Sequence, residues 1–530
     1  MSILGCFLNF GRKITYFSTF LHYLCTQILT FKHKMSETEH KKASLDHVLK
    51  YTGVFGGVQG LIMLMSVVRN KIASAFLGTA GFGLIAIYTS ISDFIQSSTN
   101  LGIPLASVQH LSELFETGDT DRIRHFVRVV RTWSFWAAIF AVLLTLATAP
   151  LLSMLFFEDE PNRAWDIALL SPMVFALTIT AGEISILKGL RHLKRVALVS
   201  AISAVSTLCL TAPFFWAMGL RGIILSLIVS TCAVTLIHLA FTTPLFPWRI
   251  SPLSRAVFQE GWPLLRIGIP YVLAALAGTG CAVLQQAFMK KESSEETLGL
   301  YRVAYTLMVC YAGIIYSAFE SDYFPRLSSV NHDVEARNQV INQQIHVSIL
   351  LVSPLLIAIV TFLPLIILFL FKDSFLPSVE MAILLSQYMF FRGITTPIGY
   401  TALARGESSL YLIMEVIYDI FSLCCVSLCF HYFGLWGAGL GLTLSAIFDL
   451  FLIGTCYGSH FHFRFSIGTI RLIIPQWIAV TLSMFSCIFI DGPWRYAIGL
   501  SLLMVSCWYS YRILSKESEI IKKFKQKLHL

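Results

Sequence analysis

The sequence predicts an all-α, polytopic membrane protein, because three observations agree. Its 530 residues are 56% hydrophobic and only 13% charged, whereas a soluble chain carries about 25% charged residues. Several long stretches lack Asp, Glu, Lys and Arg altogether. The second half repeats short motifs of the first in the same order and at a nearly constant spacing. This composition excludes a soluble enzyme and most nucleic-acid-binding proteins.

The charge-free stretches are long enough to cross a bilayer as helices, because a helix needs about 20 residues to span the hydrocarbon core. Together with the less apolar stretches between them, they predict about 14 transmembrane helices. The predicted spans are centred on residues 51–77, 80–103, 132–157, 167–187, 196–219, 220–243, 263–289, 298–320, 345–371, 380–404, 408–432, 434–456, 470–490 and 494–512.

The positions of the basic residues predict the orientation of these spans. Of the 39 Lys and Arg residues, 28 fall on the side of the N-terminal segment and 8 on the other side, and three lie within spans. Cytoplasmic loops are enriched in Lys and Arg, so both termini are expected in the cytoplasm. The net charge of +9 then reflects topology and a basic tail close to anionic lipid, not binding to nucleic acid.

The segment before Met35 is a weakly apolar stretch without an obvious signal-peptide cleavage site. A polar segment of the kind that precedes a first span begins at Met35. We expect translation to begin at Met35, and the alternative is an additional span or an interfacial helix before it.

The 12 cysteines do not predict a metal site or a disulfide framework. Ten of them lie within predicted spans, and none belongs to the paired ligand blocks of a zinc site. We therefore expect no metal and no cofactor.

Short motifs recur in one order in both halves. The clearest pairs are Pro-Leu-Leu-Ser-Met-Leu-Phe-Phe at 150–157 with Pro-Leu-Ile-Ile-Leu-Phe-Leu-Phe at 364–371, Gly-Leu-Arg-Gly at 219–222 with Gly-Leu-Trp-Gly at 434–437, and Gly-Leu at 83–84 with Gly-Leu at 299–300. Six spans return the chain to its starting side, so the halves are expected to be two parallel-repeat six-helix bundles. Such repeats are typical of transporters that rock two bundles about a central site.

The predicted organisation has six parts. They are a cytoplasmic N-terminal segment at 1–50, an N-terminal six-helix bundle at 51–245, an inter-bundle linker at 246–262, a C-terminal six-helix bundle at 263–458, two extra C-terminal helices at 459–515 and a basic cytoplasmic tail at 516–530.

Three motifs carry a family resemblance: Val-Val-Arg-Asn-Lys-Ile at 67–72, Phe-Leu-Gly-Thr-Ala-Gly-Phe-Gly-Leu at 76–84 and Asn-Leu-Gly-Ile-Pro at 100–104. With the arrangement of six, six and two spans, they resemble the polysaccharide (Wzx-type) flippases, including O-antigen flippases, of the multidrug/oligosaccharidyl-lipid/polysaccharide superfamily. The resemblance covers residues 45–515 in architecture and a much smaller part of the chain in motif. Thr79 stands where the family commonly has Pro.

This resemblance implies a carrier of undecaprenyl-diphosphate-linked oligosaccharide across the bacterial cytoplasmic (inner) membrane, for biosynthesis of O-antigen (lipopolysaccharide), capsule or exopolysaccharide. Its partners would be the lipid-diphosphate-linked oligosaccharide, membrane lipids and polysaccharide-assembly proteins, with no nucleic acid. It implies no enzyme activity. The sequence agrees in lacking a Gly-x-x-x-x-Gly-Lys-Ser/Thr phosphate loop.

Four arginines at membrane depth are the candidates for substrate binding: Arg69, Arg266, Arg302 and Arg392. Ionisable residues in spans are costly and often functional, and the guanidinium fork suits phosphate oxygens. The alternative is that they reach the interface or pair with acids. The lipid II flippase family carries an Arg-Asp pair in its first span, which Arg69 and Asn70 resemble, with Asn70 replacing the acid.

Four acids are candidates for ion coupling: Asp93, Glu415, Asp419 and Asp449. Glu415 and Asp419 are one helical turn apart and therefore share a helical face, where two carboxylates could bind a proton or Na⁺. The alternative is that they meet an arginine or lie close enough to the membrane surface to be hydrated.

Two other functions stay open. A cation-coupled multidrug exporter of the same superfamily should favour acids over several arginines and twelve spans over fourteen. A membrane polysaccharide polymerase usually has a long external loop, whereas the predicted external loops here are short.

Overall fold

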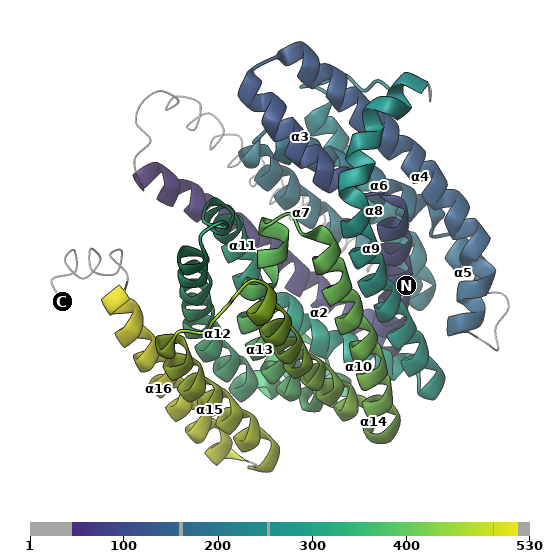
Figure 1. Cartoon of the computed structure of the whole chain (residues 1–530). Helices are drawn as coiled ribbons and strands as arrows, with labels where there is room; N and C mark the ends of the chain where they lie inside the picture. Colours follow the sequence, from purple (N-terminus) through teal and green to yellow (C-terminus); the bar gives the residue numbers. More distant parts are fainter. Residues whose placement is uncertain (1–44, 158–162, 252–254, 491, 518–530) are drawn as a thin grey trace, which may run out of the picture. The chain divides into compact units, whose positions relative to one another are not determined.

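The computed structural model describes residues 45–157, 163–251, 255–490 and 492–517. Within these ranges every regular element is a helix (Figure 1), which confirms the all-α prediction. The chain divides into two compact units, Met1–Gly57 and Val58–Leu530, and the interactions described below lie within the second. The predicted start at Met35 and most of the predicted basic tail lie outside the described residues.

The helices follow one another along the chain with short connections. They are α2 (Leu45–Thr99), α3 (Ile103–Thr117), α4 (Thr120–Phe156), α5 (Arg163–Ala168), α6 (Ser171–Gly189), α7 (Leu193–Met218), η1 (Gly219–Arg221), α8 (Gly222–Thr242), α9 (Arg255–Glu292), α10 (Glu295–Tyr305), η2 (Thr306–Tyr311), α11 (Ala312–Ser329), α12 (Val334–Leu370), η3 (Asp373–Phe375), α13 (Ser378–Ala404), α14 (Ser408–His460), α15 (Ile467–Phe489) and α16 (Pro493–Glu517).

The long helices coincide with the predicted spans. In the described ranges, nine helical segments are long and apolar enough to cross a membrane, and the protein is accordingly a multi-pass membrane protein. α2 and α14 each cover two predicted spans, and α7 to α8 cover two more. The predicted spans 298–320 and 380–404 fall on α10 to α11 and on α13, which are not among the nine. The number of fourteen crossings stays a prediction.

Glycines form equivalent tight turns in the two halves. Gly219 ends α7 with φ 57° and ψ −132°, and Gly434 interrupts α14 with φ 59° and ψ −141°. Positive φ favours glycine because it has no Cβ. A Cβ on Gly222 would lie 2.6 Å from the Phe214 carbonyl oxygen, and one on Gly437 would lie 1.9 Å from the equivalent carbonyl of the second half. Two turns of one geometry, at corresponding positions of the two halves, confirm that this motif is repeated.

The helix that holds the third predicted span of each half, α4 or α12, also begins with the same cap. The Asp119 carboxylate accepts hydrogen bonds from the backbone N–H groups of Asp121 and Arg122, both at 3.1 Å. Asp333 does the same at the start of α12, at 2.9 and 3.2 Å. An aspartate at this position satisfies backbone donors that have no partner within the helix, so both helices start at a defined residue.

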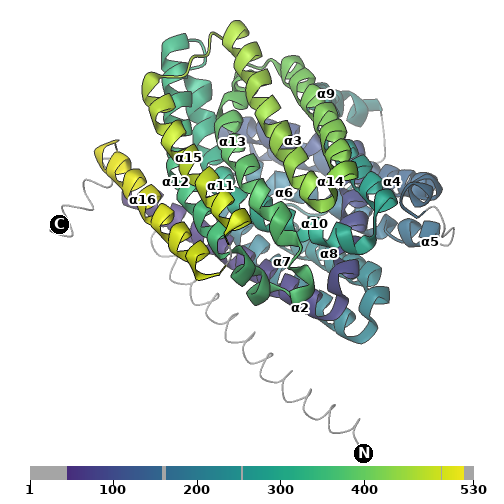
Figure 2. The ribbon, with the colours of Figure 1, turned by 90° about the horizontal axis from the view of Figure 1, so that it is seen from below.

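In the second half, α12 is the central packing element. A stripe of buried Ile, Leu and Val at helical spacing runs along it, and it contacts α11, α13, α15 and α16. The two extra helices lie beside it (Figure 2). Gln476 of α15 joins them, because its side chain donates to Ser510 and accepts from Ser506 of α16 at 3.0 and 2.7 Å.

The segments after α8 and after α14 are anchored alike. Residues 246–251 and 461–466 share Phe, Arg and Ser at their first, fourth and last positions. The first carbonyl of each segment accepts a hydrogen bond from a buried arginine, Arg131 of α4 or Arg337 of α12. The amide of each closing serine donates to a side chain of the same helix. Sequence reasoning missed this motif, although its two copies have the same spacing along the chain as the glycine turns.

Arg131 also forms a buried ion pair with Glu183 of α6. Its Nε and Nη2 donate to the two carboxylate oxygens at 2.8 and 2.9 Å, and both side chains are 1% exposed. Nη1 donates to the Phe246 and Pro247 carbonyls at 2.7 and 3.1 Å. Since every guanidinium nitrogen has a partner, the pair ties α4, α6 and the segment after α8 together.

Removing one member of this pair should be costly. Replacing Glu183 by Ala leaves Arg131 buried with an uncompensated charge, which costs about 3–5 kcal/mol. We expect a clear drop in the thermal unfolding temperature of the purified protein. Asp121, whose exposed side chain pairs with Arg124, provides the matched control, and its replacement by Ala should change little. Equal unfolding temperatures for the two variants would show that the buried pair does not hold these helices together.

Candidate functional site

The two halves meet where α2 crosses α10. A Cβ on Gly83 would lie 1.9 Å from the Glu295 carbonyl oxygen, and a Cβ on Gly299 would lie 1.9 Å from the Thr79 carbonyl oxygen. In the repeat, Gly83 corresponds to Gly299 and Thr79 corresponds to Glu295. The crossing is therefore reciprocal, as expected for a pseudo-two-fold axis between the halves, and only glycine permits the backbones to approach so closely.

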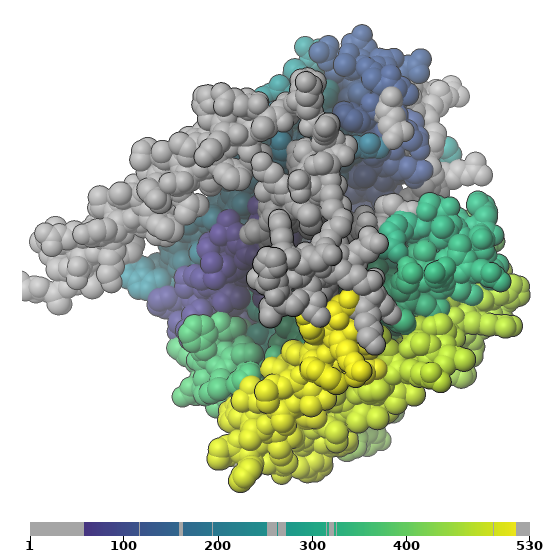
Figure 3. Space-filling model, turned by 90° about the vertical axis from the view of Figure 1, so that its left-hand side faces the viewer, coloured from purple at the N-terminus to yellow at the C-terminus, as the bar shows by residue number. Residues whose placement is uncertain are grey.

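Contacts between the halves continue next to this crossing. Lys71 Nζ donates to the Phe369 carbonyl at 2.5 Å, and Lys372 Nζ donates to the Ala75 carbonyl at 2.6 Å. The Phe82 ring packs edge-on against Phe371 at a centroid distance of 5.7 Å. In Figure 3 the purple segment of α2 accordingly lies beside green segments of the second half. By the predicted orientation, this is the external side of the membrane.

Charged residues of the two halves also lie near each other on either side of this crossing along α2. Arg302 of α10 lies close enough to Arg69 and Asp93 to interact electrostatically with both. Asn70 donates a hydrogen bond to the Tyr311 hydroxyl at 3.0 Å. We name Arg69, Asp93 and Arg302 the central cluster. It brings together three of the predicted site residues from opposite halves of the chain.

A local irregularity accompanies the central cluster. The predicted helix at 298–320 is divided into α10, a π-helical turn η2 and α11. Arg302 lies just before the π-helical turn, and Tyr311 is its last residue. Such turns frequently occur at functional sites, and hydropathy could not have predicted it because the apolar pattern continues through the break.

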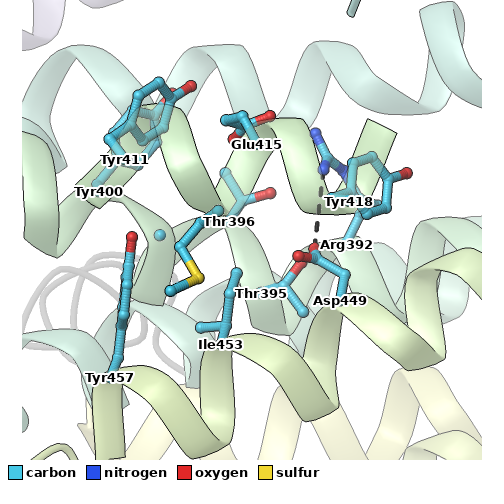
Figure 4. A pocket seen from close by; sticks show the side chains of 12 residues that line it. Arg392, Thr395, Thr396, Tyr400, Tyr411, Glu415, Tyr418, Asp449, Ile453 and Tyr457 are labelled. Carbon is cyan, nitrogen blue, oxygen red and sulfur yellow. Dashed lines mark ion pairs between the residues drawn. The ribbon is translucent and has the colours of Figure 1, made fainter. Parts of the chain in front are cut away.

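A second group of predicted residues lines a pocket within the second half. Arg392 of α13 lies beside Asp449 of α14, with 3.9 Å between Nη1 and Oδ2, and its guanidinium is 6.0 Å from the centre of the Tyr418 ring. Glu415 completes the charged lining. We name Arg392, Glu415 and Asp449 the Arg392 cluster. In Figure 4, Tyr400, Tyr411 and Tyr457 face it from the other side of the pocket.

Asp419 faces a different neighbour. It lies one turn after Glu415, but it does not line the pocket. A Cβ built on Gly278 of α9 would lie 3.3 Å from its Oδ2, and this buried oxygen has no hydrogen-bond partner among the described residues. Further along the same interface, Gln285 of α9 donates to Ser422 at 3.3 Å. Asp419 thus places a carboxylate oxygen at the interface of α9 and α14.

Tyrosines connect the two clusters. The rings of Tyr301 and Tyr305 are stacked on α10, with centroids 5.9 Å apart. The Tyr301 side chain lies near Arg302, the Tyr305 side chain lies near Arg392, and both lie near Tyr388. Sequence reasoning considered only charged residues and missed these tyrosines, although the repeated Tyr residues of α10 were visible in the sequence.

Arg266 is the remaining predicted substrate residue. It lies in α9, but its side chain lies outside the described part of the structure. Elsewhere in the described ranges, no group of three or more His, Cys, Asp or Glu side chains is arranged to hold a metal ion.

Many apolar helices, arranged in two halves that cross at a two-fold-related contact, define a helical membrane protein built from two repeats. The family described as "Polysaccharide biosynthesis protein" matches residues 73–380, and the chain belongs to this family. No curated protein matches the chain in sequence.

The chain shares its fold with solved structures of transporters. The chain is similar to the lipid II flippase MurJ in an inward closed conformation, with a TM-score of 0.68 and 13% identity over 87% of this chain and 99% of that chain. It is also similar to a multidrug resistance MATE family transporter of the MOP superfamily, inward-facing, with a TM-score of 0.60 and 14% identity over 77% and 98%. The chain therefore belongs to a family of polysaccharide biosynthesis proteins and shares the fold of the MurJ and MATE structures.

Proposed function

We propose that the protein moves undecaprenyl-diphosphate-linked oligosaccharide from the inner to the outer leaflet of the bacterial cytoplasmic membrane, for surface polysaccharide biosynthesis. The observation that carries the proposal is the central cluster, in which Arg69 and Arg302 come from different halves. Asp93 can balance only one of the two positive charges, so the cluster keeps an excess positive charge that a bound anion would neutralise. A diphosphate provides that anion, and each guanidinium can donate two parallel hydrogen bonds to it.

Alternating access follows from the position of this cluster. The glycine crossing and the lysine contacts close the halves against each other on the predicted external side. The diphosphate would enter from the cytoplasm, bind between the halves, and leave after they separate at the crossing. The orientation rests on the excess of Lys and Arg on the predicted cytoplasmic side, which also places both termini in the cytoplasm.

Deletion of the gene tests the proposal. In the native bacterium we expect loss of surface polysaccharide and accumulation of lipid-linked oligosaccharide on the cytoplasmic side, both reversed by the wild-type gene. Unchanged surface polymer in the deletion strain would reject the proposed function.

The second candidate is a cation-coupled multidrug exporter, which the fold of the MATE transporters and the carboxylates of the Arg392 cluster favour. It predicts that the deletion strain becomes sensitive to cationic drugs while its surface polymer stays normal. The same strain, examined for drug sensitivity and for surface polymer, therefore separates the two functions.

Ion coupling is assigned within this proposal to Asp419, with Glu415 and Asp449 nearby. A carboxylate oxygen without a protein partner is a ready ligand for a proton or Na⁺. We expect Asp419→Asn to remove the dependence of transport on an imposed Na⁺ or proton gradient. If transport by this variant still responds fully to the gradient, Asp419 is not the coupling residue.

A further inference from the structure

The pocket in the second half has the chemistry of a sugar-binding site. It lies between α13 and the two segments of α14 and is lined by four tyrosines, two threonines and the Arg392 cluster. We propose that this pocket binds one sugar residue of the lipid-linked head group, next to the diphosphate. The proposal rests on the proposed function and adds to it the part of the site that recognises the oligosaccharide.

The lining matches the two kinds of surface on a sugar ring. Its C–H groups form apolar faces, which aromatic rings cover, and its hydroxyls donate and accept hydrogen bonds. Tyr400, Tyr411 and Tyr457 supply rings on one side of the pocket and Tyr418 on the other (Figure 4). Glu415 and Asp449 can accept from hydroxyls, and Arg392, whose side chain is 36% exposed, can donate to them.

A threonine beside the Arg392 cluster supports this lining. Thr395 lines the pocket and is 1% exposed. Its hydroxyl lies within reach of the Asp449 carboxylate. The hydroxyl can therefore hold the Asp449 carboxylate in position to accept a hydrogen bond from a ligand hydroxyl.

Charge and size argue against the diphosphate itself in this pocket. One guanidinium stands beside two carboxylates, which would repel a phosphate but can bind a neutral polyol. The cavity volume of about 100 Å³ holds several water molecules. This is more than a bare monovalent ion fills and much less than a whole oligosaccharide, so one ring at the pocket is the fitting ligand.

The neighbouring elements place this pocket within reach of the central cluster. The Tyr305 side chain lies near Arg392, and Tyr301, on which its ring stacks, directly precedes Arg302 in α10. If the diphosphate of a head group lies between Arg69 and Arg302, its first sugar can therefore extend toward the pocket.

Binding of four lipids to the full-length protein in lipid nanodiscs tests the proposal. The probes are undecaprenyl diphosphate and the same lipid carrying one N-acetylglucosamine, one N-acetylgalactosamine or one galactose. We expect at least one glycosylated lipid to bind about tenfold more tightly than the unglycosylated lipid. Thr395→Val, which keeps the side-chain shape, and Tyr418→Leu should each remove most of this gain and leave the affinity for undecaprenyl diphosphate unchanged.

Tyr432→Leu is the matched control, because Tyr432 also belongs to α14 but is 70% exposed. It should keep the full gain. The sugar site would be overturned by equal affinities for all four lipids, or by a gain in affinity for the glycosylated lipid that survives both pocket variants. In either case, binding of undecaprenyl diphosphate would leave the proposed function intact. If the wild-type protein binds none of the four lipids, the proposed function and the sugar site are both rejected.

Discussion

Arg302→Ala is expected to abolish transport while the protein stays folded in the membrane. Arg302 lies within electrostatic range of Arg69 and Asp93 of the other half, and its loss should remove a charge-assisted contact to the diphosphate. Hydrogen bonds to charged groups contribute roughly 1.5–3 kcal/mol each, so the loss of a two-bond contact should weaken substrate binding on the order of 100-fold or more. Complementation of the deletion strain, with the protein quantified in membranes, measures the effect.

Two variants make this result specific. Arg302→Lys keeps the charge but loses the planar fork, and we expect partial activity. Arg471→Ala removes an exposed arginine of α15, outside both clusters, and should leave transport unchanged. Normal surface polymer from Arg302→Ala at a normal protein level would exclude Arg302 from the substrate site.

Gly83→Ala should block transport by a different route. The new Cβ would overlap the Glu295 carbonyl oxygen at 1.9 Å, and a backbone atom cannot move away by a change of rotamer. Overpacking costs about 1–3 kcal/mol. If this cost falls on the state in which the halves are closed, the equilibrium shifts roughly 5- to 150-fold toward the state in which they are separated. Gly299→Ala, its equivalent across the axis, should have the same effect.

Reactivity of a cysteine at position 79 reports this shift. In Thr79→Cys protein we expect faster modification by a membrane-impermeant thiol reagent from outside when Gly83→Ala is also present. Gly60→Ala is the matched control on α2, because a Cβ there meets no atom within 4 Å. Identical transport and labelling for Gly83→Ala and Gly60→Ala would exclude the crossing as the closing contact.

The sequence was sufficient for features that depend on order along the chain. Apolar length placed the helices, and the repeated Gly-Leu-x-Gly motif paired glycines 219 and 434, which have nearly the same φ and ψ in the structure. The pairing of charges was not predictable, because it depends on how helices rotate about their axes. Arg392 lies beside Asp449, whereas Asp419 lies one turn from Glu415 but faces α9.

The close backbone contact between the halves was also hidden in the sequence. Gly-Leu at 83–84 and 299–300 was visible as a repeated motif, but its reciprocal contact with the opposite backbone required the three-dimensional arrangement. The aromatic lining of the Arg392 pocket was missed for a similar reason, since tyrosines on two helices give no signal until the helices are placed together.

Translocation by the purified protein in lipid vesicles tests the central claim most directly. Vesicles carry undecaprenyl-diphosphate-linked oligosaccharide on the inner leaflet only, and its arrival outside is followed by a glycan-oxidising reagent that does not cross the membrane. We predict that wild-type protein accelerates the arrival over protein-free vesicles and that Arg302→Ala does not. No acceleration by folded wild-type protein, or equal acceleration by Arg302→Ala, would contradict transport through the central cluster.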